Sequence, residues 1–368
     1  MRKINYTVLL ALLCITLNGQ QEVHPVYETD TIGKEKNFQA LVLPVLFYTP
    51  ETSVGLGVGS QLFLLRESNT YNSRLSNMFV SVIYTLNNQL IIDLQPQIYF
   101  DRGDYFLDMA FKFKIYPNSF WGIGNSTPES DKEVYNMTSS EVRVAVLKRL
   151  PPKLNFGFEY VLEFYDVTET EEGGILESGT VLGSDHAVIS GLGAIFNLDS
   201  RDNTSSPNSG HFLQLNARFS SELFGATSGF NKYIFDLRTY RPIGKKSIVA
   251  IQLYSESTYG EIPFQALAWY GGGERARGYF RGRYIDNNQY VLQAEYRWRF
   301  KPRWVLAGFV LVGEVADLPR NFFADLKPSY GGGVRFQISK SLQTLLRFDV
   351  GFGKDGSGGF YFGVDEAF

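Results

Sequence analysis

Hydrophobic and polar residues alternate along most of the chain, and residues 289–300 show this pattern clearly. Successive side chains of a β-strand point to opposite faces, so this segment presents one apolar, aromatic face and one charged face. Unpaired charges are too costly to bury in a protein core, so the charged face is expected to line a polar interior. The segment therefore predicts a wall strand whose outward residues are Tyr290, Leu292, Ala294, Tyr296, Trp298 and Phe300, and whose inward residues are Val291, Gln293, Glu295, Arg297 and Arg299.

Sixteen segments of this kind follow one another from residue 38 onward. Most contain ten to fifteen residues, longer than the ~5–6 residues usual for strands of soluble proteins. Such lengths suit tilted strands that cross a bilayer. The segments are 38–48, 52–65, 75–86, 89–101, 104–116, 136–150, 153–167, 184–198, 211–221, 229–243, 246–259, 289–300, 304–315, 329–338, 342–353 and 359–368.

The connections between these segments alternate in length. Long connections at 117–135, 168–183 and 260–288 fall on one side, whereas most on the other side are two or three residues long, with 66–74 and 199–210 as exceptions. Short turns on one side and long loops on the other are typical of outer-membrane barrels. The predicted fold is all-β, a 16-stranded antiparallel transmembrane β-barrel with a long internal loop between strands 11 and 12.

A soluble β-sandwich is the alternative fold. It would explain the alternation of apolar and polar residues. It would not explain the charged inner faces, the aromatic content of 15% or the unequal connections. The barrel is therefore the favoured prediction.

The first residues of the chain resemble a secretory signal peptide. Arg2 and Lys3 precede an apolar run at 8–17, and polar residues follow it, so we expect cleavage after Gly19 or Gln20. The predicted organisation is a signal peptide at 1–19, a short periplasmic lead at 20–37 and the barrel at 38–368.

The single cysteine, Cys14, falls inside the predicted signal peptide. A lipoprotein anchor at Cys14 is the alternative, but Leu13 stands where the lipoprotein signal has a small residue. The mature chain is therefore expected to have neither a disulfide nor a thiolate metal site.

Charge and hydropathy agree with a membrane barrel. No apolar run reaches the ~18 residues that a membrane helix needs. Removing Arg2 and Lys3 from the 35 basic residues leaves 33 against 38 acidic ones, a net charge of −5. We therefore expect no nucleic-acid partner, and we expect the protein to be integral to the bacterial outer membrane, with outer-membrane lipid around it.

Residues that could carry chemistry are few. His24, His186 and His211 are not spaced as metal ligands with other histidines or carboxylates, so no metal is expected. The sequence has no GxSxG motif, and no helix is predicted after the glycine-rich run at 55–60, as a phosphate loop would require. No catalytic residue, cofactor or enzymatic activity is predicted.

Two acidic clusters allow two interpretations each. Glu159 and Glu163 share an inward face, where they could perform acid–base chemistry or simply line the lumen. The loop at 168–179 could hold a cation or be a solvated outer loop. The second interpretation is favoured in both cases, because lumens and outer loops of such barrels are ordinarily polar.

A loop rich in glycine and arginine precedes the strand at 289–300. Its glycines permit tight folding, and guanidinium groups bind carboxylates through two hydrogen bonds. Glu295 on the next strand offers such a carboxylate inside the barrel. The loop either braces and plugs the barrel or takes part in substrate handling or gating, and its charged residues are Glu274, Arg275, Arg277, Arg281 and Arg283.

Several short motifs of the chain occur together, in the same order, in one known family. The tip Ala276-Arg277-Gly278-Tyr279 is similar to a V-R-G-F/Y motif, and Glu295-Tyr296-Arg297 is similar to an E-Y-R strand. Arg201, Asp202, Asn203, Pro207 and Gly210 resemble an RDN-x-P-x-G turn, and further similarities lie at 120–125, 333–336 and 347–349. The chain thus resembles the BamA/TamA family of outer-membrane assembly proteins, the bacterial surface antigen family, whose barrel has sixteen strands.

The resemblance implies that two acidic groups inside the barrel hold the tip arginine, Arg277, which is followed by Gly278 and Tyr279. One of them matches Glu295. The other belongs to an F-x-D-x-G strand, which here has Leu311 in the place of the aspartate, while Glu314 falls on the opposite face. We therefore expect Arg277 to be held less firmly or by a different partner.

The end of the chain reads as the last strand of a barrel. Phe360, Phe362, Val364 and Phe368 share one parity, so we expect them on one face of a strand that seals against the first.

The resemblance implies a function in outer-membrane biogenesis, with insertion or transport of protein or lipid. Family members with that function carry periplasmic POTRA domains, for which the lead at 20–37 is too short. We therefore expect an outer-membrane or periplasmic protein partner that supplies them. The alternative is a plugged channel or structural outer-membrane barrel without assembly activity.

Overall fold

The computed structural model describes residues 38–49, 53–64, 76–100, 104–151, 153–338 and 345–368. The predicted signal peptide (1–19) and periplasmic lead (20–37) lie outside these residues. Among the described residues, no helix is long and apolar enough to cross a membrane. The helical segments are single 3₁₀ turns: η4 (Glu129–Asp131), η5 (Glu222–Phe224), η6 (Phe264–Ala266), η7 (Pro319–Asn321) and η8 (Lys354–Gly356).

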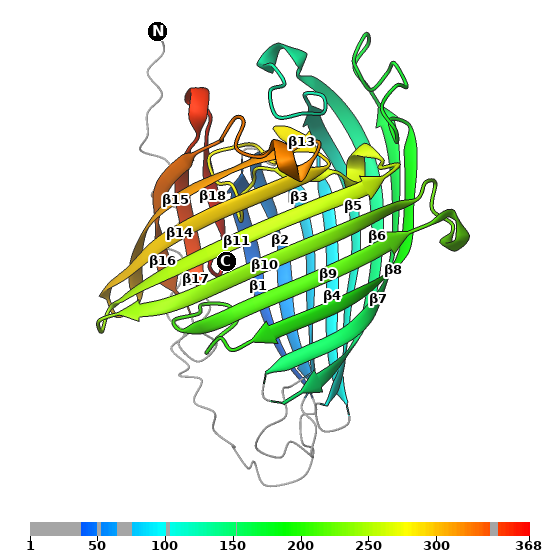
Figure 1. Cartoon of the computed structure of the whole chain (residues 1–368). Helices are drawn as coiled ribbons and strands as arrows, with labels where there is room; N and C mark the ends of the chain where they lie inside the picture. Colours follow the sequence, from blue (N-terminus) through cyan, green and yellow to red (C-terminus); the bar gives the residue numbers. More distant parts are fainter. Residues whose placement is uncertain (1–37, 50–52, 65–75, 101–103, 152, 339–344) are drawn as a thin grey trace. The chain divides into compact units, whose positions relative to one another are not determined.

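One antiparallel sheet of sixteen strands curves into a barrel shape, and each strand pairs with its neighbours in sequence (Figure 1). Every predicted segment overlaps one of these strands, so the predicted fold class is confirmed. The strands are β1 (Phe38–Thr49), β2 (Ser53–Leu64), β3 (Ser76–Thr85), β4 (Leu90–Phe100), β5 (Tyr105–Phe120), β6 (Glu133–Leu150), β7 (Leu154–Glu169), β8 (His186–Asp199), β9 (Gly210–Ser220), β10 (Phe230–Ile243), β11 (Ser247–Gly260), β14 (Asn288–Lys301), β15 (Trp304–Ala316), β16 (Ser329–Gln337), β17 (Leu345–Phe352) and β18 (Gly358–Val364).

The two faces of the strands differ as the alternation predicts. On β14, Leu292 and Tyr296 are exposed on the outside, whereas Gln293, Glu295 and Arg297 are buried on the inside. An aromatic and aliphatic outer surface suits contact with lipid hydrocarbon, and the polar side chains face the lumen.

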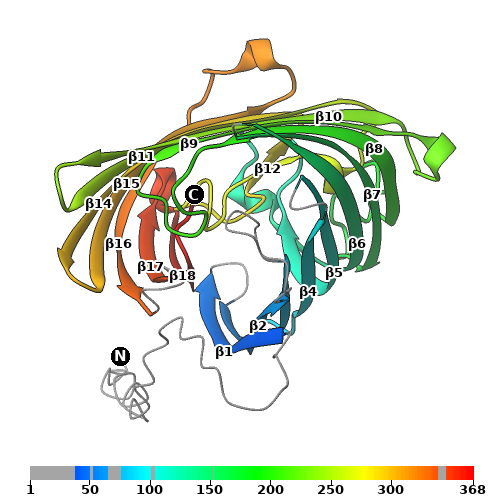
Figure 2. The ribbon, with the colours of Figure 1, turned by 90° about the horizontal axis from the view of Figure 1, so that it is seen from below.

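The connection between β11 and β14 folds inside the sheet (Figure 2). It contains a small hairpin made of β12 (Ala268–Tyr270) and β13 (Tyr284–Asp286). Aromatic residues of the loop pack against inward residues of β11, β14 and β15 in one buried cluster, here called the loop core. Its members are Tyr254, Tyr270, Ala276, Tyr279, Tyr284, Val291, Phe309, Leu311 and Val315.

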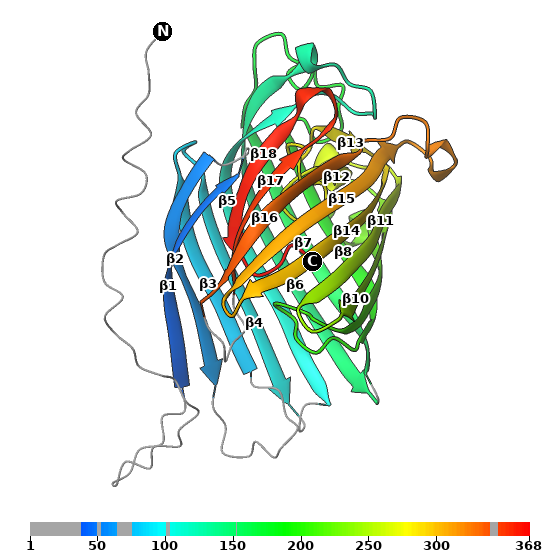
Figure 3. The same cartoon turned by 90° about the vertical axis from the view of Figure 1, so that its left-hand side faces the viewer.

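The sheet is not closed, because no strand pairing joins the described residues of β1 and β18. The two strands approach each other (Figure 3), and the rings of Tyr48 and Phe360 meet edge to face with centroids 6.5 Å apart. The expected seal between the last and first strands is therefore wrong. β18 is only seven residues long, and the chain turns after Val364 because Asp365 takes a left-handed conformation with φ 64°.

The outward face generates a prediction about stability. Leu253 lies at the centre of β11, opposite Leu292 of β14, whereas Ile243 ends β10 beside a short turn. Leu253→Arg should lower the free energy of unfolding by about 2–4 kcal/mol, and Ile243→Arg by about 0–1 kcal/mol, since a charge is costliest at the bilayer midplane. Urea unfolding in lipid vesicles measures both; equal losses would contradict the assigned depth.

Candidate functional site

The tip of the internal loop meets β17 and β18 at very close range. Gly278 has a φ of 109°, and a Cβ atom there would lie 2.9 Å from the main chain at Phe352 and Gly353. Only glycine tolerates both conditions. The Gly278 N–H donates a hydrogen bond of 2.9 Å to the hydroxyl of Tyr361, so the tip is fastened to the end of the sheet beside the open seam.

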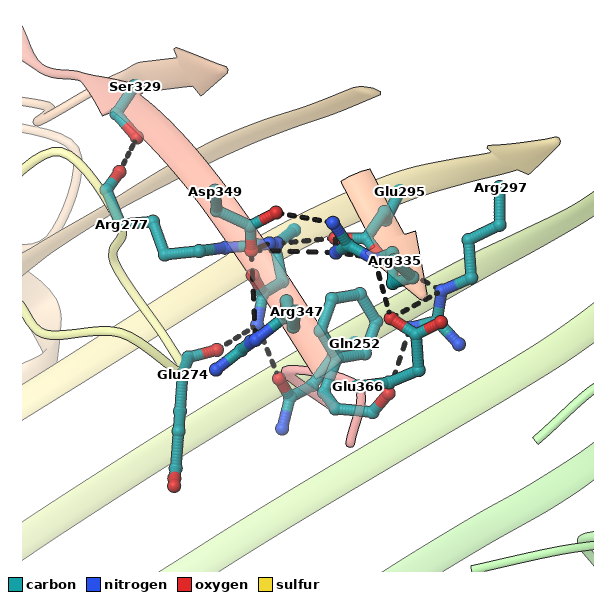
Figure 4. A network of polar contacts seen from close by, with 12 residues as sticks. Gln252, Glu274, Arg277, Glu295, Arg297, Ser329, Arg335, Arg347, Asp349 and Glu366 are labelled. Carbon is teal, nitrogen blue, oxygen red and sulfur yellow. Dashed lines mark hydrogen bonds and ion pairs between the residues drawn. The ribbon is translucent and has the colours of Figure 1, made fainter. Parts of the chain in front are cut away.

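Arg277, at this tip, is fully buried and lies between two carboxylates (Figure 4). Its Nη1 donates to Oδ2 of Asp349 at 2.6 Å, and its Nη2 lies 2.7 Å from Oε2 of Glu295. The contact with Glu295 is short enough for an ion pair, but its angle does not meet the criterion for a hydrogen bond. The guanidinium also stacks over Phe309, 3.6 Å from the ring centroid, a geometry that favours a desolvated cation.

Arg335 of β16 joins the same two carboxylates from the other side. It bonds to Asp349 through Nη1 and to Glu295 through Nη2 at 3.2 Å. Its Nε donates to Glu366 at 2.9 Å. These contacts belong to what we call the central network: Arg277, Glu295, Arg297, Arg335, Arg347, Asp349 and Glu366.

The second carboxylate around Arg277 confirms the expectation of a different partner. Asp349 of β17 takes this place, two strands away from Leu311 of β15 in the sheet. Leu311 packs in the loop core, where an aspartate would face aromatic rings. Glu314, on the opposite parity as expected, binds outer-loop groups and accepts from the N–H of Asp325 at 3.0 Å.

The end of the chain also departs from the expected arrangement. Phe360 and Val364 point outward with about half of their surfaces exposed, and Phe362 is half-buried. Phe368 instead turns into the lumen and is buried against Tyr240 and Ala250. The expectation of one shared face is therefore wrong for Phe368, because the turn at Asp365 ends the alternation.

The turn that resembles the RDN-x-P-x-G motif folds through its own side chains. Asp199 forms an ion pair with Arg201 at 2.9 Å, and Oδ1 of Asn203 accepts two main-chain N–H bonds. Asp202 accepts two others, and Gly210 has a φ of 104°. Pro207 lies in the same turn, which touches the end of the chain where Glu366 N donates to Ser205 O at 3.2 Å.

The outer loops cover the internal loop from above. Gly124 forms a β-bridge with Ile285 of β13, and Arg283 donates to the main-chain oxygen of Thr127 at 2.9 Å. Trp121 packs edge to face on Phe280. A second buried cluster contains Phe120, Tyr135, Met137, Leu176, Phe264, Leu267 and Ile285, so the outer end is closed largely by apolar packing.

The periodic pattern of the sequence gave no indication of these contacts between loops. Lys327 and Lys354 both bind Asp325, and these bonds, that of Lys327 foremost, lower the pKa of its carboxyl group. The motif at 120–125 was noted only for its resemblance to the family, and its Asn125 donates to the main-chain oxygen of Asp325 at 3.1 Å.

The polar contacts of the lumen suit a structural role, in which they hold the internal loop in position. Within the described ranges, no group of three His, Cys, Asp or Glu residues could hold a metal ion. His186 bonds the adjacent Asp185, and His211 bonds Thr239, both at the surface. Glu159, inside the lumen, pairs with Arg218 at 2.5 Å. The central network thus fixes the loop in place, while Glu159 and Arg218 bind each other between β7 and β9.

Comparisons with known proteins address the fold and the family. The sequence matches the Omp85 superfamily domain over residues 56–368, and no curated protein matches it. The structure is similar to BamA from Haemophilus ducreyi lacking POTRA domains 1–3, with a TM-score of 0.63 and 12% identity over 90% of this chain and 70% of that one.

Two CdiB structures are also similar to the chain. CdiB from Acinetobacter baumannii gives a TM-score of 0.56 at 13% identity, over 90% of this chain and 60% of that one. CdiB from Escherichia coli gives 0.59 at 10% identity, over 91% and 64%. This chain therefore spans less than two thirds of either CdiB chain, and the likeness is one of fold.

The contacts of Arg277 generate a prediction for a double-mutant cycle. Arg277→Ala should destabilise the folded protein by about 3 kcal/mol, because it leaves two buried carboxylates with less compensation. Combining it with Asp349→Ala should cost less than the sum of the single losses, by about 1–3 kcal/mol, because the two groups are in direct contact. Urea unfolding gives the energies, and loss of the heat-resistant band on gels gives an independent reading.

Arg283→Ala is the matched control for this cycle. Arg283 belongs to the same loop, but its ion-pair partner Glu129 is largely exposed and its other bonds go to the neutral oxygens of Thr127, so the loss should be smaller, about 1–2 kcal/mol. Strictly additive effects of Arg277→Ala and Asp349→Ala would show that the pair does not hold the loop.

Proposed function

Because this chain belongs to the Omp85 superfamily, we propose that it acts in outer-membrane biogenesis by inserting or transporting protein or lipid. Membership of the superfamily indicates an outer-membrane barrel. The kind of substrate and the step performed are the proposal. We also propose that the protein is not an enzyme, since its lumen charges serve to bind one another.

The observation that carries this proposal is the attachment of the internal loop to the unpaired edge of the sheet. The tip binds Tyr361 of β18, and Arg277 binds Asp349 of β17. An edge with unpaired N–H and C=O groups can accept a further strand. A fixed loop beside such an edge supports a role in handling an incoming chain, with the loop keeping β17 and β18 in position.

A protein partner in the periplasm or the outer membrane is part of the proposal. One structure similar to this chain is a BamA lacking POTRA domains 1–3, and the chain spans 70% of its length. We propose that a partner supplies the corresponding periplasmic domains. The apolar outer face implies outer-membrane lipid as the second kind of neighbour.

A plugged channel is the second candidate function. The observation in its favour is the outer end, where the loops pack through Phe120, Phe264 and Ile285 into an apolar cluster. A lumen closed in this way would pass little current until the loop is removed.

Depletion of the protein tests the first candidate. We expect lower amounts of other outer-membrane proteins, or altered outer-membrane lipid, when both are quantified after depletion. Re-expressed Arg277→Ala should restore them less well than Arg283→Ala, because the former removes the buried attachment of the loop. An unchanged proteome and unchanged lipid would count against biogenesis.

Planar-bilayer recording tests the second candidate. Replacing residues 271–287 with a short glycine–serine linker should raise the single-channel conductance if the loop occludes the lumen. Wild-type protein and Arg283→Ala, which keep the loop, serve as controls. A conductance that stays at the wild-type level would exclude the plugged channel.

A further inference from the structure

A small pocket lies inside the barrel at the end opposite the long loops. It has a volume of about 130 Å³ and is bounded by the turn after β8, the turn between β10 and β11, and the lower part of β14. We call it the inner pocket. The lining residues that matter here are Pro207, Lys245, Lys246, Arg297, Arg299 and Glu366.

Arg297 lines this pocket and carries an unsatisfied donor. Its Nε pairs with Glu295 at 2.7 Å, and its Nη2 donates to the main-chain oxygen of Phe368 at 3.0 Å. Nη1 has no hydrogen-bond partner within the described part of the chain, although the residue is only 2% exposed. Buried guanidinium N–H groups are almost always bonded, so this one marks a place for an acceptor.

The rest of the pocket is strongly cationic. Lys245 and Lys246 stand exposed in the turn between β10 and β11, and the described residues place no carboxylate in an ion pair with either. Arg299 bonds only neutral oxygens, those of Pro302 and Gln337. The single carboxylate in the lining, Glu366, is already held by Arg335 at 2.9 Å.

We propose that the inner pocket binds a carboxylate side chain of an acidic peptide segment presented from the periplasmic side. The direction of approach rests on the proposed function, which assigns the short turns to the periplasm. Nη1 of Arg297 would donate to one carboxylate oxygen, and the two lysines at the entrance would attract the segment.

The position and lining of the pocket favour this ligand. Arg297, Arg299 and Val305 face the lumen, so a lipid headgroup would have to leave the membrane surface to reach them. Pro207, Pro242 and Ile248 offer apolar contact to the methylene groups of a glutamate. Phosphate would need several convergent donors, whereas the buried part of the site offers a single free one.

Fluorescence anisotropy on the full-length protein in micelles tests the proposal. The probe is a fluorescein-labelled peptide of alternating glutamate and alanine, and its glutamine counterpart serves as the uncharged control. At low salt (about 50 mM), Lys245→Gln with Lys246→Gln should weaken binding of the acidic peptide by about tenfold, since two attractive charges are lost. Both lysines lie in an exposed turn, so folding should be retained.

Arg149→Gln with Lys153→Gln is the matched control, because it removes two positive charges beside another turn on the same side, one at the end of β6 and one just before β7. We expect less than about a twofold change for this variant. Equal weakening by the two variants would overturn the proposal, as would wild-type affinity of the Lys245/Lys246 variant. Displacement of the peptide by inorganic phosphate but not by glutarate would also overturn it.

The purified-protein measurement is independent of any assembly activity. If the peptide binds as expected while depletion leaves the proteome and lipid unchanged, the proposed function fails and the pocket stands. If depletion has its effect but the peptide does not bind, the pocket assignment fails alone.

Discussion

A fully buried guanidinium has to find carboxylates, and Arg277 imposes this requirement on the interior of the barrel. Leaving such a charge without compensation costs several kcal/mol. Its partners Glu295 and Asp349 come from β14 and β17, and Arg335 of β16 binds both of them. The strands β14, β16 and β17 are therefore joined by their inward charges as well as by main-chain hydrogen bonds. The loop cannot leave the lumen without disturbing the ion pairs of all three strands.

The same charges connect the loop with the open seam. Arg335 binds Glu366 through Nε while its Nη groups bind Asp349 and Glu295. Glu366 lies in the segment that follows the left-handed residue Asp365. A strand that continued β18 beyond Val364 would have to give up these contacts. The short length of β18 therefore agrees with the position in which the Glu366 carboxylate is needed.

The sequence predicted the walls of the barrel well and its interior only in part. Alternation depends on the two-residue period of a strand, so it reports which face a residue occupies and how long the strand is. It does not report which inward residues become neighbours across the lumen. Asp349 belongs to the motif at 347–349, but its position beside Arg277 depends on the curvature of the whole sheet.

Phe368 was misplaced for a local reason. The alternation through the last residues assumed an extended chain, whereas Asp365 takes a φ of 64°, which non-glycine residues adopt uncommonly. The N–H of Asp365 donates to the main-chain oxygen of Leu345 at 2.7 Å, so contact with the preceding strand fixes the turn.

The interior of the barrel is held differently at its outer end and in its middle. The outer end closes through apolar clusters, which a soluble ion cannot loosen. The middle of the lumen is held by the central network, with four arginines against three carboxylates. A charged ligand at the inner end would shift the position of the loop only if it bound two arrangements of this network with different affinity.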